Sequence, residues 1–404
     1  NHPNLSNEAK VLLEKGLVLP ESIANQMVEN QIEVYGLPYG IVPELIVNGK
    51  SYIVPMVTEE PSVIAAASYA SKLINMADGT TTVQEKREMI GEIAIVKSPL
   101  TLEEVKTKLD EQKESLFTIA NNAHPSIVKR GGGIREIWVE EKSTDKERFY
   151  IFYVSVDTKE AMGANMLNTI LEALVSPIEA LTDGESIMAI LSNLATNSVV
   201  TARCVLSPRI LDTRTTKGED VIDRIVLASE FSKADPYRAT THNKGIMNGI
   251  DSVVIATGND WRAIEAGAHA YASLNGQYQP LTSWTKDEAG NLVGTITLPL
   301  PVGTVGGSIS IHPGAQFAHE LLGHPSAIEL AGIIASIGLA QNLAAVRALV
   351  TDGIQKGHMR LQAKSLGLAV GATEEELPLL MNLLAKAPHL NQETAKSLLE
   401  ELRK

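Results

Sequence analysis

The chain has 404 residues, 44% of them hydrophobic and 21% charged, which is the composition of a globular protein with two or three domains. Its formal net charge of -13 argues against a nucleic-acid partner, because phosphates attract a cationic surface. A single cysteine excludes an intrachain disulfide and fits a reducing compartment.

The first 85 residues predict an α/β unit. Residues 7–30 have helical spacing, 52–57 predict a strand, and the alanine-rich segment 61–76 predicts a buried helix. Glu59 and Glu60 stand just before that helix, where the helix dipole favours carboxylates. The turn-rich segment 78–82 then predicts a linker.

Residues 86–196 predict a small inserted domain. Its expected elements, in order, are a strand at 89–96, a helix at 102–122, strands at 134–141 and 149–156, a helix at 161–181 and a strand at 186–191. This β-α-β-β-α-β succession is the ferredoxin-like split pattern. The expected fold class is therefore α/β (α+β), with a large mixed domain over 1–85 and 197–352, the small domain over 86–196, and a helical C-terminal segment over 353–404.

The remaining elements belong to the large domain. Cys204 lies in an expected strand at 199–206, as a buried and inert thiol. Residues 287–291 predict a hairpin turn, and 328–349 predict a core helix. Because no apolar run reaches the ~18 residues that span a bilayer and the start has no signal pattern, we expect a cytoplasmic protein with no membrane contact.

The most distinctive stretch covers residues 241–250 and 256–262, where polar side chains stand among glycines. Glycines at 245, 249 and 258 permit tight turns and a close approach of backbone to a ligand. Lys244 and Asp260 offer a cation and an anion for a paired site. The alternative for such a segment is a glycine-rich surface turn that happens to carry a lysine.

Other motifs point away from common sites. His319 and His324 are five residues apart with Pro325 next, whereas a zinc protease helix needs histidines four apart, so we expect no metal site. Neither a Walker lysine motif nor a G-x-G-x-x-G after a strand is present, which excludes the usual nucleotide loops.

Four separated motifs resemble those of the 3-hydroxy-3-methylglutaryl-coenzyme A (HMG-CoA) reductases, specifically the soluble bacterial class II enzymes. They are residues 59–68, 160–165, 241–262 and 357–360, in the order and at about the spacing of the family. The resemblance covers roughly the whole chain. It implies a small domain that binds the dinucleotide without a Rossmann fold, a C-terminal flap over 353–404, and a homodimer with its active site at the subunit interface.

The resemblance also implies four catalytic residues. Lys244 would stabilise the oxyanion that forms on the thioester carbonyl, and Glu60 would donate its proton. Asp260 would hydrogen-bond Lys244 and Glu60, and a protonated His358, on the flap, would quench the coenzyme A thiolate. Many bacterial members have another histidine where this chain has Gln362, which leaves an auxiliary role of that position in doubt.

Substrate and cofactor residues follow in the same way. Arg238 would bind the glutaryl carboxylate, with Ser62 and Asn248 as further polar contacts. The expected cofactor-binding residues are His124, Glu160, Met162, Gly163, Asn165 and Asn193. Many family members have aspartate at the place of Glu160.

Cofactor preference depends on residues 121–130. Family members that prefer NADH carry an aspartate there, whereas this chain has Ala123 or His124 at the matching place. A carboxylate would repel a 2′-phosphate, while His124, Lys129 or Arg130 could pair with one. We therefore expect NADPH, with NADH as the alternative.

The implied reaction is the reduction of HMG-CoA to mevalonate and coenzyme A with two NAD(P)H, in the mevalonate pathway of isoprenoid biosynthesis. Three alternatives remain open at this point. They are the reverse reaction in NADH-linked mevalonate breakdown, another oxidoreductase of acyl thioesters, and a noncatalytic protein that binds coenzyme A or a dinucleotide.

Overall fold

The computed structural model describes residues 5–213, 215–351 and 363–403. Within these residues the buried apolar side chains form three clusters, one over residues 42–74 and 200–346, one over residues 89–195, and one near the C-terminus. The mixed α/β fold expected from the sequence is confirmed. The domain boundaries drawn from the sequence stay predictions.

The N-terminal region contains two short helices and a hairpin. The helical stretch expected over 7–30 is interrupted, because the chain leaves α1 (Asn7–Lys15) at Gly16 with a φ of 90° and restarts after Pro20 as α2 (Glu21–Met27). Strands β1 (Tyr39–Val47) and β2 (Lys50–Val57) then pair as an antiparallel hairpin. The alanine-rich helix α3 (Val63–Asn75) packs against β1.

A second sheet has the strand order β3-β8-β10-β9, and all its pairs are antiparallel. Its strands are β3 (Thr81–Val83), β8 (Val199–Leu206), β10 (Leu292–Pro299) and β9 (Thr282–Lys286). The expected turn at 287–291 joins β9 to β10. In β8, burial raises the pKa of the Cys204 thiol to about 12, so this cysteine is inert.

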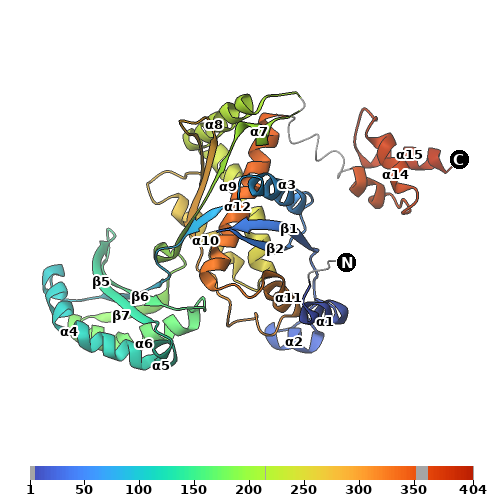
Figure 1. The fold of residues 1–404 in the computed structure, drawn as a ribbon. Helices are drawn as coiled ribbons and strands as arrows, with labels where there is room; N and C mark the ends of the chain where they lie inside the picture. The colour runs from blue at the N-terminus through green and yellow to red at the C-terminus, as the bar shows by residue number, and fades with distance from the viewer. Residues whose placement is uncertain (1–4, 214, 352–362, 404) are drawn as a thin grey trace.

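Helices fill the rest of the larger body. They are the 3-10 helix η1 (Thr196–Ser198), α7 (Pro208–Leu211), α8 (Gly218–Ala234), α9 (Pro236–Ala256), α10 (Trp261–Ala272), α11 (Pro313–Leu322) and α12 (Ala327–Val350). Figure 1 shows α12 running through the middle of this body, where it packs against α3 and α9.

Helix α12 differs from one expectation drawn from the sequence. Among the described residues it is the one helix long and apolar enough to cross a membrane, although no apolar run of that length was expected. However, 67% of its most apolar window is buried inside the protein. It is therefore the core helix that the segment 328–349 predicted.

The glycine-containing segment 241–250 is the interior of α9 and not a turn. Asp235 caps this helix by accepting a bond from the Arg238 N–H at 2.9 Å, and Pro236 occupies the first helical position. Burial against α12 and β2 overrides the weak helix propensity of Gly245 and Gly249. Gly258, by contrast, does lie in a turn, with a φ of 71°.

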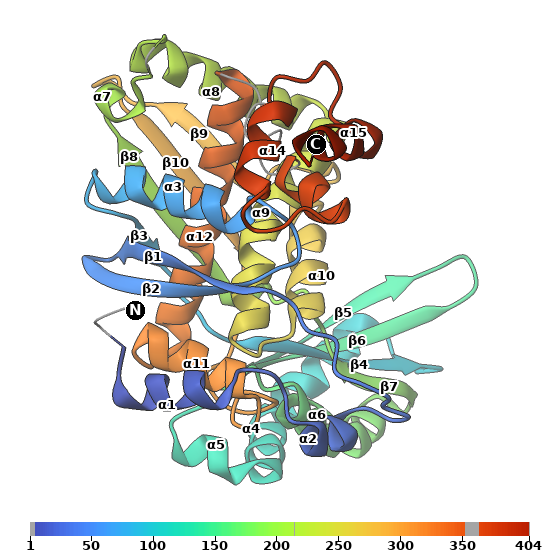
Figure 2. The ribbon, with the colours of Figure 1, turned by 90° about the vertical axis from the view of Figure 1, so that its right-hand side faces the viewer.

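The inserted segment forms its own layered unit. It contains β4 (Met89–Val96), α4 (Leu102–Ala123), α5 (Pro125–Lys129), β5 (Gly133–Ser143), β6 (Arg148–Asp157), α6 (Ala164–Thr182) and β7 (Glu185–Leu191). The strand order is β5-β6-β4-β7, all antiparallel, which is a split β-α-β arrangement. Helices α4 and α6 lie together on one face of this sheet (Figure 2).

The C-terminal helices have a small core of their own. Helices α14 (Leu377–Leu384) and α15 (Gln392–Leu402) bury Leu380, Leu384 and Leu399 between them. The expected hinge at 353–358 and His358 lie outside the described residues. The flap function of this region stays a prediction.

Candidate active site

A groove with a mainly apolar lining and several polar side chains lies between three helices of the larger body. Its walls come from the N-terminal end of α3, one stripe of α9 and one stripe of α12, and it encloses about 550 Å³. The stripe of α9 presents Arg238, Thr241, Lys244, Gly245 and Asn248. These residues recur at helical spacing, so they share one face of the helix. We call this cavity the α9 groove.

Glu60, Lys244 and Asn248 meet at the centre of the α9 groove. The Glu60 carboxylate lies 2.5 Å from Lys244 Nζ through Oε2, and its Oε1 accepts from Asn248 Nδ2 at 3.1 Å. Lys244 and Asn248 are one helical turn apart on α9, which lets both reach the same carboxylate. The structure therefore brings together three of the residues selected from the sequence.

Local structure at the end of β2 sets the position of Glu60. Thr58 Oγ1 accepts from the Glu60 N–H at 3.2 Å, and Ser62 then adopts a left-handed φ of 74° before α3 begins. This sharp turn places Glu60 over α9. The Glu60 side chain remains 38% exposed and that of Lys244 60%, so both can be reached by a ligand.

The groove also holds polar atoms without a protein partner. Ser62 Oγ and Gln341 Oε1 are buried, and no described residue hydrogen-bonds to either atom. Arg238 lies at the other end of the α9 stripe, and burial lowers the pKa of its guanidinium. Because an unpaired buried polar group is costly, these atoms are suited to a polar ligand.

Gln341 was not selected from the sequence. It lies on α12 and is 5% exposed, with its side chain in the wall of the α9 groove. A signal was present, because Gln341 and Asn342 stand next to each other in a mostly apolar helix. That Gln341 faces the α9 groove, however, follows only from the packing of α12 against α9.

A second cavity lies where the inserted unit meets the larger body. It encloses about 510 Å³ and is lined by Met162, Gly163 and Asn165 from the start of α6 and by Asp260 and Arg262 from the start of α10. Gly163 has a φ of 90°, and a Cβ there would lie 2.3 Å from Thr158 Cγ2, so only glycine fits. We call this cavity the α6 pocket.

The start of α6 has no side-chain cap. Its first amide groups therefore face the α6 pocket without a side-chain partner, and such a helix end attracts anions. Three of the residues expected to bind cofactor, Met162, Gly163 and Asn165, lie in this pocket together.

Within one chain, Asp260 does not lie next to Lys244 and Glu60, the two residues that it was expected to contact. Its carboxylate caps α10 by accepting from the Ala263 N–H at 3.1 Å, and it lines the α6 pocket instead of the α9 groove. At ~1.5 Å per residue, Lys244 lies about 18 Å along the helix axis from Ala256, the last residue of α9. Asp260 lies beyond that end of the helix. The expected bonds from Asp260 to Lys244 and Glu60 are therefore absent from this chain.

Glu160 points away from the α6 pocket. Its Oε2 accepts from the Ala327 N–H at 2.7 Å, at the start of α12, and from Thr304 Oγ1 at 3.1 Å. It lines a neighbouring cavity with His319, Glu320 and His324. The direct cofactor contact expected for Glu160 is thus not supported by its position.

Two other expected cofactor residues lie outside the α6 pocket. Asn193 is exposed, and its carbonyl packs over Gly267 of α10, where a Cβ would approach within 2.6 Å. His124 lies between α4 and α5, with Nδ1 3.2 Å from Ser126 Oγ. His124 therefore lies at a different part of the inserted unit from the α6 pocket.

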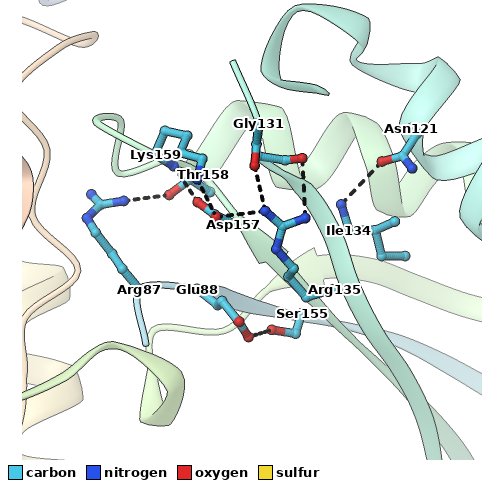
Figure 3. A network of polar contacts seen from close by, with 11 residues as sticks. Arg87, Glu88, Asn121, Gly131, Ile134, Arg135, Ser155, Asp157, Thr158 and Lys159 are labelled. Atoms are coloured by element: carbon cyan, nitrogen blue, oxygen red, sulfur yellow. Dashed lines mark hydrogen bonds and ion pairs between the residues drawn. The ribbon is translucent and has the colours of Figure 1, made fainter. Parts of the chain in front are cut away.

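A polar network holds the loop that carries Met162 and Gly163 (Figure 3). Arg135 and Lys159 both contact Asp157 at 2.9 Å, and together they hold the pKa of that carboxyl below its usual range against the opposing effect of burial. Arg87 donates to Thr158 Oγ1 at 3.1 Å and to the Ala161 carbonyl at 3.0 Å.

Arg87 also donates to the Val302 carbonyl of the larger body. Next to it, Asn259 bonds both the N–H and the carbonyl of Gly303, at 2.7 and 3.0 Å. A Cβ on Gly303 would lie 2.6 Å from the Met162 nitrogen, so the two backbones pack closely. These contacts attach the 158–162 loop on one side of the α6 pocket, and Asn259 on the other side, to the segment 302–303.

Comparisons with known proteins agree with these features. The model of the hydroxymethylglutaryl-coenzyme A reductase family matches residues 4–363. The chain is 42% identical to the 3-hydroxy-3-methylglutaryl-coenzyme A reductase of Archaeoglobus fulgidus, over 98% of this chain and 89% of the relative. It is 38% identical to a probable enzyme of the same name from Borreliella burgdorferi, over 86% of this chain and 78% of the relative.

Solved structures give the same result. A class II 3-hydroxy-3-methylglutaryl-CoA reductase from Streptococcus pneumoniae, bound to NADPH in open conformations, superposes with a TM-score of 0.84. The two sequences are 53% identical, over 99% of this chain and 96% of the other.

Proposed function

The chain belongs to the hydroxymethylglutaryl-coenzyme A reductase family, and on that premise we propose how its two cavities perform the reaction. The reaction is the reduction of HMG-CoA to mevalonate and coenzyme A with two NADPH. The observation that carries the proposal is the contact of Lys244 with Glu60 and Asn248 in the α9 groove. A cation and an acid at one point are what a developing oxyanion requires.

The substrate lies along the α9 groove. Arg238 binds the terminal carboxylate, because its planar guanidinium matches a carboxylate and stands at one end of the stripe. Lys244 then lies at the thioester end. Ser62 Oγ and Gln341 Oε1, which have no described partner, supply further polar contacts to the acyl group.

NADPH supplies one hydride to the thioester carbon and a second to the aldehyde carbon. In the first step Lys244 stabilises the charge on the carbonyl oxygen, and Glu60 protonates that oxygen to give a hemithioacetal. The hydroxyl proton then returns to Glu60 as the carbon–sulfur bond breaks. The sulfur leaves with the electron pair and takes a proton from His358.

In the second step the aldehyde oxygen takes its proton from Glu60 again, which yields the alcohol of mevalonate. Lys244 stabilises the same oxygen in both steps. The role of His358 rests on the family resemblance, since this residue lies outside the described part of the chain.

The α6 pocket is the proposed site for the nicotinamide and pyrophosphate. The left-handed φ of Gly163 and its close contact with Thr158 require glycine at this position, and the uncapped start of α6 offers amide groups to an anion. Met162 and Asn165 line the same space. Glu160 is proposed to hold this loop from behind and not to contact the cofactor.

The preference for NADPH rests on the region from His124 to Arg130. Lys129 and Arg130 are exposed, and neither forms an ion pair with a described residue. A basic pair of this kind suits a 2′-phosphate. The Streptococcus pneumoniae relative was solved with NADPH, which supports the same choice.

The active site is proposed to form between two copies of the chain. Hydride transfer requires the nicotinamide to touch the thioester carbon. Within one chain, however, the α9 groove lies along residues 238–248, whereas the α6 pocket lies beyond the C-terminal end of α9. A partner's α6 pocket, with its Asp260, would complete the α9 groove of the first copy. Asp260 would then reach Lys244 and Glu60 across the interface of a homodimer.

We place this enzyme in the cytoplasm, in the mevalonate pathway of isoprenoid biosynthesis. Production of mevalonate with NADPH is the direction that the basic region near Arg130 favours. An NADH preference would instead fit mevalonate breakdown by the reverse reaction.

The first test is the loss of absorbance of reduced nicotinamide when HMG-CoA is added. We expect turnover with NADPH exceeding that with NADH, and a loss of ~10² to 10³ in rate for Lys244→Ala, which removes the oxyanion cation. Lys233→Ala is the control, because Lys233 forms a 2.6 Å ion pair with Glu230 on α8, does not line the α9 groove, and should leave the rate unchanged when replaced. Turnover with NADH alone would overturn the cofactor proposal. Binding of both ligands without turnover would favour a noncatalytic protein.

A further inference from the structure

Helix α9 carries two glycines in its interior, Gly245 and Gly249, one turn apart. Glycine inside a helix is less stable than alanine, because it loses more backbone freedom on folding. Each glycine therefore needs a structural or functional reason.

Gly249 has a structural reason. A Cβ at this position would lie 2.9 Å from Gln341 Cβ and 3.2 Å from Ile337 Cγ2, both on α12. Such distances are too short for a side chain without movement of α12. Gly249 thus permits the close packing of the two helices.

Gly245 has no such reason. A Cβ at Gly245 would meet no atom of the described residues within 4 Å. The residue is half-buried and lines the α9 groove. The stability of the helix is therefore reduced at a point where protein packing does not require it, beside the Lys244 and Glu60 contact.

The position of the missing side chain can be inferred from helix geometry. A helical side chain covers the surface over the turn that precedes its own Cα. A side chain at Gly245 would extend toward Thr241, along the groove stripe of α9 that also carries Arg238 and Lys244. Buried Ser62 Oγ and Gln341 Oε1, which lack described partners, lie in the walls of the same groove.

We propose that Gly245 determines specificity for the branched acyl chain, because its missing side chain makes room for the carbon that bears the methyl and hydroxyl groups. This inference rests on the proposed function, with the carboxylate at Arg238 and the thioester at Lys244. The branched carbon then lies between these two ends. It is wider than a methylene chain, and a methyl group at position 245 would occupy the space that it needs.

The test compares two thioesters on three forms of the protein. The dissociation constants of HMG-CoA and of 3-hydroxyglutaryl-CoA, which lacks only the methyl branch, are measured by calorimetry without NADPH. The forms are the unaltered protein, Gly245→Ala and Gly249→Ala. The midpoint of thermal unfolding is measured on each form as well.

For Gly245→Ala we expect a higher unfolding midpoint and binding of HMG-CoA weakened by about tenfold or more, the size of effect that one misplaced methyl group has in a pocket. Binding of 3-hydroxyglutaryl-CoA should weaken much less. For Gly249→Ala we expect a lower unfolding midpoint, and, because displacement of Gln341 does not distinguish the methyl branch, a similar change of affinity for the two thioesters.

Unchanged affinity of Gly245→Ala for HMG-CoA, or equal weakening for both thioesters, would overturn the inference. This failure differs from a failure of the proposed function, which would appear as the unaltered protein not oxidising NADPH with HMG-CoA. The comparison of Gly245→Ala with the unaltered protein decides the inference even if Gly249→Ala does not fold.

Discussion

A buried histidine supports the catalytic helix from behind. His242 is 2% exposed, and its Nε2 lies 2.5 Å from Thr282 Oγ1. Thr282 donates in turn to Asn342 Oδ1 at 2.9 Å, so the protonated Nε2 of a neutral imidazole donates to Thr282. Trp284 Nε1 donates to the same Asn342 oxygen at 2.7 Å. This chain of bonds ties α9 to β9 and α12.

The protonation of His242 should make stability depend on pH. Burial, and secondarily the charge of Arg238, lowers the pKa of His242 from 6.5 to about 4. The unfolded chain therefore takes up this proton at a higher pH than the folded protein does. The contribution of neutral His242 to the free energy of unfolding is complete above pH 6.5 and is lost as the pH falls toward 4. The slope is about 1.4 kcal/mol per pH unit.

Chemical unfolding from pH 7 to 4 measures this effect on the unaltered protein and on His242→Gln, at one protein concentration. Glutamine does not titrate and can still donate to Thr282. We expect the variant to lose less of its free energy of unfolding over this range, by up to about 3 kcal/mol. Equal losses in both proteins would show that His242 does not carry the effect.

At the scale of elements, Arg87 should connect domain placement to cofactor binding. It joins the 158–161 loop to Val302 of the larger body, and it does not line the α9 groove. Losing hydrogen bonds to a charged group costs about 1.5–3 kcal/mol, or ~10- to 100-fold in affinity. We therefore expect Arg87→Met to raise KM for NADPH by about tenfold or more and to leave the affinity for HMG-CoA unchanged.

Steady-state kinetics with each ligand varied separately measures this difference. Arg148→Met is the matched control, because Arg148 donates to the Ser98 carbonyl at 2.6 Å within the inserted unit and away from the 158–161 loop. A similar rise in KM for NADPH in both variants would mean that Arg87 acts only through general stability.

The sequence predicted most elements of the inserted unit, because their apolar periodicity is strong and each element packs locally. Strand β4 was predicted at 89–96 as observed. The segment 241–250 was the main difference, since glycines and amides favour turns locally while packing against α12 imposes a helix. Local patterns carry no information about such a partner.

The candidate site was predictable to a similar extent. Motif resemblance selected Glu60, Lys244 and Asn248, and the structure brings them into contact. It did not reveal Gln341, the absence of a packing reason for Gly245, or the turn of Glu160 toward α12, because each depends on which helices face one another.

At the scale of the whole molecule, the central claim is that one chain supplies Lys244 and its partner supplies the α6 pocket with Asp260. Within one chain the two cavities are separated along α9. A closed dimer with twofold symmetry would create two equivalent sites, each using both copies.

Subunit complementation tests this claim most directly. Lys244→Ala and Asp260→Asn proteins, each inactive alone, are unfolded, mixed in equal amounts and refolded together; asparagine retains the cap on α10. If each site uses both copies, every mixed dimer has one intact site, and the mixture should regain about a quarter of normal activity. If each site uses one chain alone, every site keeps one substitution, and a mixture that stays inactive while forming mixed dimers would contradict the account.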